Sequence, residues 1–249
     1  MMIDTAYVDV PVGDLPMRSC LLRPRAAGVY PGVVFYSDIF QLTGPTLRWA
    51  ARLAGYGFVV LAPEIYHRVE PPGTVLGFDD DGKARGQADV EALGVAEFDV
   101  DVRAALDHLA ADPGVGRLGA AGHCTGGHLA FRAAAQPDVA ATTLWYPTGL
   151  HDGKLGADAD SGTLGLAPTI AGELLLVFGD RDPHTPAAGR EVVRAALDAA
   201  GTRYAWRVYD AEHAFGRDVG PRYDPESTDR AFAETVAVLR RGLASSGVR

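Results

Sequence analysis

Residues 119–131, GAAGHCTGGHLAF, hold the strongest candidate for chemistry in the sequence. Cys124 stands near their centre, with Gly122 and Gly126 two residues away on either side. This spacing is that of the nucleophile elbow G-x-S-x-G, with sulfur in place of the serine oxygen. Glycines suit the flanking positions because a strand that turns sharply into a helix leaves little room for side chains. We interpret Cys124 as a candidate nucleophile, the alternative being a buried structural cysteine in a glycine-rich turn.

A nucleophile at this position needs help from other parts of the chain. The elbow would present the sulfur at the carboxyl end of a sheet, where ligands bind in open α/β folds. It would also begin a helix, whose free N–H groups favour a thiolate. Because an ordinary thiol is only a few per cent ionised at pH 7, a base or a local positive field is also required.

Two later segments offer an acid and a base. The stretch LLLVFGDRDPHTP ends an apolar run and carries Asp180 and Asp182, and VYDAEHAFGRD ends the next one and carries His213. The order nucleophile, acid, histidine is that of α/β-hydrolase triads. The alternatives are a turn or capping role for either aspartate and an ordinary surface loop for His213. The other six histidines fit less well and show no metal-ligand spacing, so neither a metal nor another cofactor is predicted.

The elements that must position these groups follow from apolar patterning. Continuous apolar runs alternate with helical patterns, which indicates a mostly parallel sheet with helices on both faces, in a single α/β domain spanning residues 1–249. We predict residues 71–87 to be irregular and Thr148–Gly165 to be a surface excursion over one end of the sheet. The expected strands are 5–12, 17–24, 32–38, 58–66, 115–123, 139–147, 173–180 and 203–210, the first two forming a hairpin, and the expected helices are 45–57, 88–113, 125–135, 187–201 and 229–243.

Bulk composition excludes several classes of protein. The 249 residues are 47% hydrophobic and 22% charged, as in ordinary globular proteins. The net charge of −9, without a Lys/Arg cluster, argues against a nucleic-acid partner. No apolar run approaches the roughly 18 residues that a membrane span needs, and no secretory signal is visible, so we expect a cytoplasmic protein with no membrane partner. Cys20 and Cys124 are then expected to be free thiols, although their number alone permits one disulfide.

Several separated motifs together resemble the dienelactone hydrolases, a cysteine-using branch of the α/β-hydrolases. The resemblance extends from about Gly32 to the last helical pattern. GHCTGG looks like the family elbow, although an aromatic residue is more usual where His123 stands. FGDRDPHTP is similar to the segment with the triad aspartate and selects Asp182 over Asp180, and YDAEHAF is similar to the segment with the triad histidine, His213. DIFQLT and PEIYHR resemble the family's loop after the third strand and the end of the strand that follows.

The resemblance implies the α/β-hydrolase fold and hydrolysis of a lactone or small carboxylic ester through a cysteine acyl-enzyme. It also implies that the backbone N–H groups of Ile39 and Thr125 stabilise the oxyanion. Asp38 stands where family members usually carry a glutamate, which would hold the resting cysteine as a thiol until substrate arrives. Aspartate is one methylene shorter, and capping of its own loop is the alternative role for Asp38.

The resemblance further implies a substrate-binding set. Arg85 and Arg217 align with two arginines that the family associates with the substrate carboxylate and with the acid, and a solvated surface charge is the alternative for each. Tyr146 is one of the aromatic residues at strand ends that could line the pocket, the alternative being a place in the hydrophobic core. Asp89 replaces a family aromatic, which points to a substrate other than dienelactone.

The predicted partner is therefore a small-molecule ester or lactone, anionic if the arginines bind it. Two rival functions remain open on the sequence. One is a general carboxylesterase or thioesterase with a small acyl pocket, and the other is a non-catalytic binding protein on the hydrolase scaffold.

Overall fold

One eight-stranded sheet organises the chain, in the spatial order β1-β2-β4-β3-β5-β6-β7-β8. The computed structural model describes residues 1–244. β1 and β2 form the predicted antiparallel hairpin, β2 also pairs antiparallel with β4, and all other neighbours are parallel. The strands are β1 (Ile3–Val12), β2 (Leu15–Pro24), β3 (Tyr30–Tyr36), β4 (Val59–Pro63), β5 (Val115–His123), β6 (Val139–Trp145), β7 (Glu173–Gly179) and β8 (Tyr204–Tyr209).

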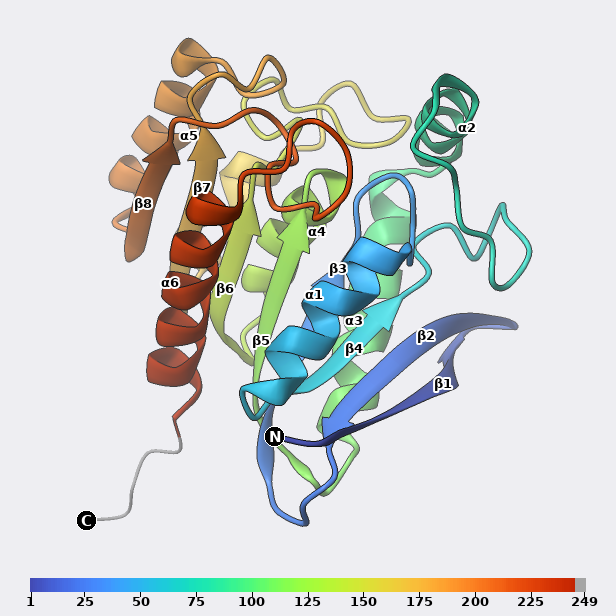
Figure 1. The fold of residues 1–249 in the computed structure, drawn as a ribbon. Helices are drawn as coiled ribbons and strands as arrows, with labels where there is room; N and C mark the ends of the chain where they lie inside the picture. The colour runs from blue at the N-terminus through green and yellow to red at the C-terminus, as the bar shows by residue number, and fades with distance from the viewer. Residues whose placement is uncertain (245–249) are drawn as a thin grey trace.

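Helices cover both faces of this sheet, so the predicted fold class is confirmed. In Figure 1, α1 and α6 lie in front of the sheet and α3, α4 and α5 lie behind it. Trp49 of α1 and Phe232 of α6 pack into one core cluster, whereas Phe98 of α3 and Leu129 of α4 pack into another. The central strands read as continuous apolar runs because they are buried on both faces. The helices are α1 (Gly44–Gly55), α2 (Asp80–Glu91), α3 (Val95–Ala110), α4 (Thr125–Ala134), α5 (Ala187–Ala200) and α6 (Pro225–Leu243).

Two sequence predictions near the middle of the chain were wrong. Residues 71–87 are not irregular throughout, because α2 begins at Asp80. The expected helix 88–113 is divided between the end of α2 and α3, which are separated by residues 92–94. The sequence pattern did not predict the start of α2 because this helix buries only Gly82 and Gly86 and therefore lacks the periodic apolar residues of an amphipathic helix. Its start is marked instead by the Asp79 carboxylate, which accepts a hydrogen bond from the Gly82 N–H at 2.8 Å.

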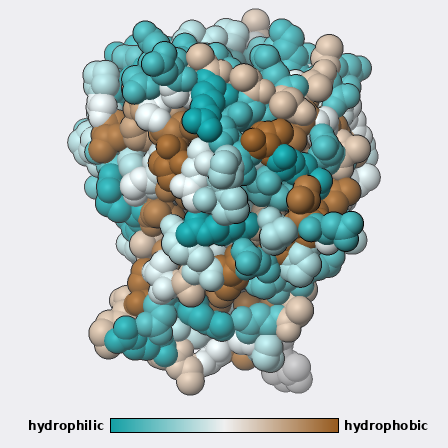
Figure 2. All heavy atoms as spheres, turned by 90° about the vertical axis from the view of Figure 1, so that its right-hand side faces the viewer, coloured by the Kyte–Doolittle hydropathy of each residue, from teal (hydrophilic) through white to brown (hydrophobic). Residues whose placement is uncertain are grey.

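α2 stands apart from the sheet, above the carboxyl ends of the strands (Figure 1). On the face of the molecule that includes α2, hydrophilic and apolar side chains are interspersed (Figure 2). The helix nevertheless approaches the loop after β3 closely, since a Cβ at Gly86 would lie 2.4 Å from the Ile39 carbonyl oxygen. α2 is thus docked on the loop that carries Asp38 and Ile39.

The segment between β6 and β7, predicted as a surface excursion, is anchored to the helices behind the sheet. The Ala157 N–H donates to the Leu93 carbonyl at 2.8 Å. The Asp158 carboxylate accepts the Val95 N–H at 2.8 Å and so caps α3. A short 3-10 helix, η1 (Thr163–Thr169), completes the segment before β7. These contacts make the excursion a wall above the sheet rather than a free loop.

Both cysteines are free thiols, Cys20 buried in β2 and Cys124 partly buried at the end of β5. Of the helices in residues 1–244, none is both long enough and apolar enough to span a membrane.

Candidate active site

The chain turns sharply at Cys124, between β5 and α4. Its backbone has φ 57° and ψ −122°, a strained combination for a residue other than glycine. A Cβ at Gly122 would lie 1.9 Å from the Gly126 carbonyl oxygen, and one at Gly126 would lie 2.2 Å from the Tyr36 carbonyl oxygen. Both flanking glycines are therefore required by close backbone approach, which is the geometry of a nucleophile elbow.

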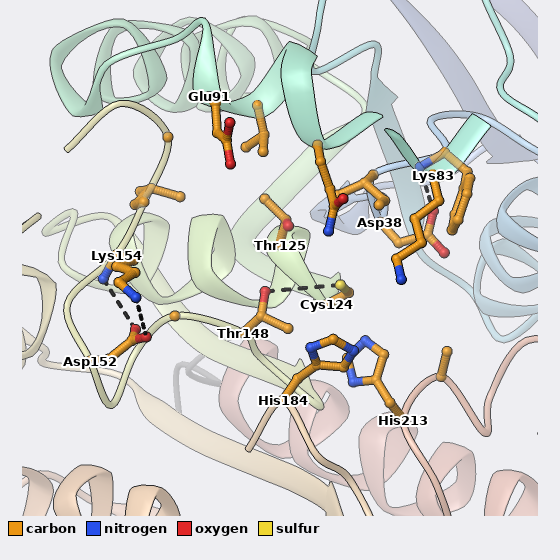
Figure 3. Close-up of a pocket in the computed structure, with 18 of the residues that line it drawn as sticks. Asp38, Lys83, Glu91, Cys124, Thr125, Thr148, Asp152, Lys154, His184 and His213 are labelled. Carbon is orange, nitrogen blue, oxygen red and sulfur yellow. Dashed lines mark hydrogen bonds and ion pairs between the residues drawn. The ribbon is translucent and has the colours of Figure 1, made fainter. Parts of the chain in front are cut away.

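Cys124 opens into a cavity of about 1010 Å³ at the carboxyl end of the sheet (Figure 3). The residues around the sulfur come from separate elements: Asp38 and Ile39 from the loop after β3, Thr125 from the first turn of α4, and His213 from the loop after β8. α2 and the excursion form the outer walls. Within residues 1–244, no group of three or more His, Cys, Asp and Glu side chains is placed to hold a metal ion.

His213 lies below Cys124 in Figure 3. Its Nδ1 is hydrogen-bonded to Asp182. The Nδ1–Oδ2 distance is 2.7 Å, and both residues are buried. Burial opposes a charge on the imidazole, but Cys124 and Asp182 outweigh it and raise the pKa of His213 to about 9. Since Nδ1 is bound to the carboxylate, Nε2 is the nitrogen left to face the sulfur.

Asp182 is the aspartate that the fold brings to His213, whereas Asp180 is exposed. Burial alone would raise the pKa of Asp182. Hydrogen bonds from His213, from the His184 N–H at 2.8 Å and from the Thr185 hydroxyl at 3.0 Å outweigh burial and hold that pKa below its ordinary value. The carboxylate is therefore fixed in position and charged.

Asp38 caps its own loop and faces Arg217. Its Oδ1 accepts the Phe40 N–H at 3.0 Å, and its Oδ2 lies 4.0 Å from the Arg217 guanidinium. Burial raises the pKa of Asp38 above its usual range, although the Phe40 N–H, Arg217 and His213 oppose the rise. The Arg217 guanidinium also lies over the ring of Phe78, 4.2 Å from its centroid, so the side chain is held in place while it lines the cavity.

Comparison with known proteins agrees with this geometry. The model of the dienelactone hydrolase family matches residues 17–243. This chain belongs to the dienelactone hydrolase family. A Saccharomyces cerevisiae protein named "Putative carboxymethylenebutenolidase" is 34% identical over 229 residues, 88% of this chain and 84% of that protein. The carboxymethylenebutenolidase of Pseudomonas sp. (strain P51) is 28% identical over 221 residues, 88% of each chain.

Among solved structures, the one titled "Putative Dienelactone Hydrolase" from Klebsiella pneumoniae superposes with a TM-score of 0.81 at 26% identity, covering 97% of this chain and 100% of that one. The α/β-hydrolase fold and the assignment to a family of hydrolases are thereby established for this chain.

His123, the unusual elbow residue for a dienelactone hydrolase, is packed as an aromatic ring. Its centroid lies 5.0 Å from that of Phe35, 4.8 Å from that of Trp49 and 5.2 Å from that of Trp145. Burial lowers the pKa of His123 to about 3, so the imidazole is neutral. The departure from the family pattern therefore preserves the packing that an aromatic residue provides.

Two predicted binding residues lie outside the lining of the cavity. Arg85 is directed to the Glu70 carboxylate by two hydrogen bonds, of 2.6 and 2.5 Å. Tyr146 is buried behind the histidine, with its ring centroid 5.1 Å from that of His213. Arg217 is the predicted arginine that lines the cavity. Asp89 lies beside the Glu70–Arg85 pair rather than at the sulfur, and its Oδ2 is buried without a hydrogen-bond partner in residues 1–244.

Several residues of the cavity were not predicted from the sequence. The chain contains only two lysines, Lys83 on α2 and Lys154 in the excursion, and both line the cavity. Lys154 is paired with Asp152 at 3.5 Å. His184, one of the six histidines that fit a triad less well, lines the cavity with its ring centroid 4.6 Å from that of His213, and Thr148 contacts Cys124. The scarcity of lysine was the one signal in the sequence that could have singled out Lys83 and Lys154.

Proposed function

We propose that this dienelactone hydrolase family member cleaves a lactone or small carboxylic ester through an acyl-enzyme on Cys124. The observation that carries the proposal is that Cys124 and His213 line one cavity, with the buried Asp182 carboxylate hydrogen-bonded to His213. A histidine whose pKa is raised to about 9, beside a cysteine and a fixed carboxylate, supports transfer of the thiol proton to the imidazole when the nucleophile is activated.

In the first step the Cys124 sulfur attacks the carbonyl carbon and the carbonyl π electrons move to oxygen. The N–H groups of Ile39 and Thr125 are proposed to receive the resulting oxyanion, each donor contributing a few kcal/mol of barrier lowering. Collapse of the intermediate forms the thioester and breaks the carbon–oxygen bond. The leaving alkoxide takes the proton from His213, and in a lactone it stays attached to the acyl group.

In the second step neutral His213 takes a proton from water, which attacks the thioester carbonyl. Collapse of the second tetrahedral intermediate releases the carboxylic acid and returns the thiolate. Asp182 keeps Nδ1–H directed away from the sulfur throughout, so Nε2 moves the proton in both steps.

The resting role of Asp38 follows from its contacts. Its hydrogen bond to the Phe40 N–H and its approach to Arg217 support a carboxyl that shapes the loop carrying Ile39. We therefore assign Asp38 to the oxyanion loop in the first place and to the switching of Cys124 only through that loop.

An anionic acyl group is the preferred substrate class. Arg217 and Lys83 line the cavity, and Figure 3 shows the Lys83 side chain extending into it on the Asp38 side. The lining also carries acids, including Asp79, Asp80 and Glu91, so recognition of an anion needs local cations. Lys154 and Arg222 line the cavity too but are paired with Asp152 and Glu212, so we assign this role to Arg217 and Lys83. Arg85, occupied by Glu70, is not part of this set.

A broader carboxylesterase or thioesterase activity is the second candidate, favoured by the size of the cavity. About 1010 Å³ lies at the upper end of the range for small-molecule pockets and exceeds the needs of a five-membered lactone. The two candidates differ in their preferred acyl length, so a series of esters from acetate upward separates them.

The decisive experiment for covalent catalysis is intact-mass detection of the acyl-enzyme. A panel of lactones and short anionic and neutral esters is mixed rapidly with wild type and with Cys124→Ala. A mass increase equal to the acyl group in wild type, absent from Cys124→Ala, supports the proposal. An unmodified mass during turnover, or full turnover by Cys124→Ala, would refute it. Absence of both turnover and thiol alkylation would favour a binding protein on the hydrolase scaffold.

A further inference from the structure

Thr148, the second residue after Tyr146 beyond β6, contacts the elbow at two points. Its backbone N–H donates to the Cys124 carbonyl at 3.2 Å. Its hydroxyl oxygen lies 3.9 Å from the Cys124 sulfur, within reach of a long hydrogen bond to sulfur (Figure 3). Thr148 and His213 approach the sulfur from different sides in this view. The hydroxyl therefore has a position that the triad does not use.

His128, on the second turn of α4, fixes Thr148 from behind. Its Nδ1 lies 2.9 Å from the Thr148 carbonyl oxygen. Because a carbonyl oxygen only accepts hydrogen bonds, Nδ1 must carry the hydrogen. Burial lowers the pKa of His128 to about 4, against the opposing effect of the Thr148 carbonyl, so the ring is neutral at physiological pH. Its Nε2 is then an acceptor.

The acceptor nitrogen has a matching donor. The Thr163 hydroxyl lies 2.8 Å from His128 Nε2 and itself accepts a hydrogen bond from Arg132 at 2.8 Å. The Arg132 guanidinium is in turn held by Asp99 of α3 through two hydrogen bonds of 2.6 Å. This chain of contacts, buried at His128, Thr163 and Arg132, joins α3, α4 and the excursion. It ends at the carbonyl of Thr148, whose hydroxyl faces Cys124.

Gly149 allows the chain after Thr148 to pass close to His128. Its φ is +76°, a conformation that favours glycine. A Cβ there would lie 2.1 Å from the Lys154 carbonyl oxygen and 3.2 Å from His128 Nδ1. The turn after Thr148 is thus confined by the Lys154 backbone and the His128 side chain, which fixes the position of the Thr148 hydroxyl.

We propose that the Thr148 hydroxyl donates a hydrogen bond to the Cys124 sulfur in its thiolate form, and that neutral His128 is the positioning residue that holds it there. The inference rests on the proposed function, since it assigns a partner to the same nucleophile. Hydrogen bonds to the charged form of a group favour that form. The other charged or titratable groups near the sulfur are His213, Asp38, Tyr66 and Tyr146. Those elsewhere in the lining of the cavity are Lys83, Arg217, His184, Asp79, Asp80, Glu91, His151, Asp152, Lys154, Asp158 and Arg222.

The test is the pH dependence of Cys124 alkylation by iodoacetamide, measured by intact mass in wild type, Thr148→Val and Thr148→Ser. Valine keeps the branched shape and removes the hydroxyl, whereas serine keeps the hydroxyl. Alkylation of buried Cys20 is subtracted with Cys124→Ala. We expect the midpoint of thiolate formation to rise by about one pH unit in Thr148→Val and to stay within about 0.3 unit of wild type in Thr148→Ser.

An unchanged midpoint in Thr148→Val would overturn the proposal, even if the variant unfolds at a lower temperature, because a merely structural threonine changes stability alone. His128→Leu should raise the midpoint as Thr148→Val does, and His128→Gln, whose amide can still donate to the Thr148 carbonyl, should raise it less. If His128→Leu fails to fold, the comparison of Thr148→Val with Thr148→Ser still tests the proposed hydrogen bond.

The outcome is separable from the proposed function because alkylation needs no substrate. Retained turnover in Cys124→Ala would refute covalent catalysis and leave the effect of Thr148 on the thiol measurable. An inactive Cys124→Ala together with an unshifted Thr148→Val would refute only the role of Thr148.

Discussion

The Nδ1 atom of His213 lies 2.7 Å from Oδ2 of Asp182, in a pair that is almost completely buried. The contact selects one tautomer of the neutral imidazole, with hydrogen on Nδ1 and a lone pair on Nε2 toward Cys124. The same carboxylate accepts the His184 N–H and the Thr185 hydroxyl, so it has little freedom to turn away.

Replacing this carboxylate should be far more damaging than replacing its neighbour. Asp182→Asn presents an amide that can donate to Nδ1 and stabilise the wrong tautomer, so kcat should fall by roughly a thousandfold or more. Asp180→Asn, at an exposed position two residues earlier, is the matched control and should stay within about twofold. The measurement is kcat of both variants on an ester that the wild type hydrolyses. A larger loss in Asp180→Asn than in Asp182→Asn would show that the acid is misassigned.

The rate of ester hydrolysis should fall as the pH rises through about 9. The leaving alkoxide needs the proton of His213, whose folded-state pKa is raised to about 9. The same shift implies that the ion pair stabilises the fold fully below about pH 6.5, the ordinary histidine value, and loses this contribution as pH rises through 9. A kcat/KM profile over pH 6–11 measures the loss of rate, and urea unfolding at the same pH values measures the loss of stability. An alkaline limb centred near pH 7 would contradict the assignment.

Arg217 and Arg85 should behave differently toward anionic substrates. Arg217→Ala should weaken kcat/KM for an anionic ester by about ten- to a hundredfold relative to a neutral ester of equal acyl size, since a charge-assisted hydrogen bond contributes about 1.5–3 kcal/mol. Arg85→Ala should leave this ratio unchanged because Glu70 occupies its guanidinium.

Coupling to Asp38 separates the two uses of Arg217. If the guanidinium mainly steadies the oxyanion loop, Arg217→Ala and Asp38→Asn should give non-additive losses on both substrates. Equal losses of kcat/KM on the anionic and neutral esters, without coupling to Asp38, would show that Arg217 neither binds the substrate nor steadies the loop. Lys83→Met in the same assay tests the second cation.

Asp89 should make the protein less stable as pH rises. Burial, followed by the nearby Glu70 carboxylate, raises the pKa of Asp89 to about 6. Its neutral form therefore stabilises the fold fully below about pH 4, and this contribution is lost as pH passes 6. Asp89→Asn should flatten the stability profile between pH 4 and 7 and raise the melting temperature at pH 7.5. Thermal unfolding across this range is the measurement, with Asp81→Asn on the exposed side of α2 as the control.

The groups at the carboxyl end of the sheet were predictable because parallel strands deliver their following residues to one edge. Cys124, His213 and the two aspartates Asp180 and Asp182 each follow an apolar run, so order along the chain predicts one edge for all of them. The resemblance to the dienelactone hydrolases selects Asp182. Arg85 was placed by resemblance alone, with a solvated charge as the alternative, and its hydrogen bonds to Glu70 leave it outside the lining of the cavity. The sequence pattern does not predict that contact.

The outer walls of the cavity were not predictable in the same way. α2 has almost no buried face, so its residues lack the periodicity that identifies a helix, and Lys83 could not be assigned to the cavity. Thr148 lies in a segment rich in Gly and Asp whose path depends on His128, Asp158 and Leu93, all distant in sequence. Such tertiary anchors leave no local pattern.

The distribution of lysine has a practical consequence for chemical labelling. Apart from the amino terminus, every primary amine of the chain belongs to Lys83 or Lys154, and both line the cavity. Reductive methylation with ¹³C-formaldehyde would therefore introduce NMR reporters on two opposite walls and otherwise only at the α-amine. Ligand screening by their chemical shifts would need no engineered tag, and a crosslinker anchored at either amine would sample whatever occupies the site.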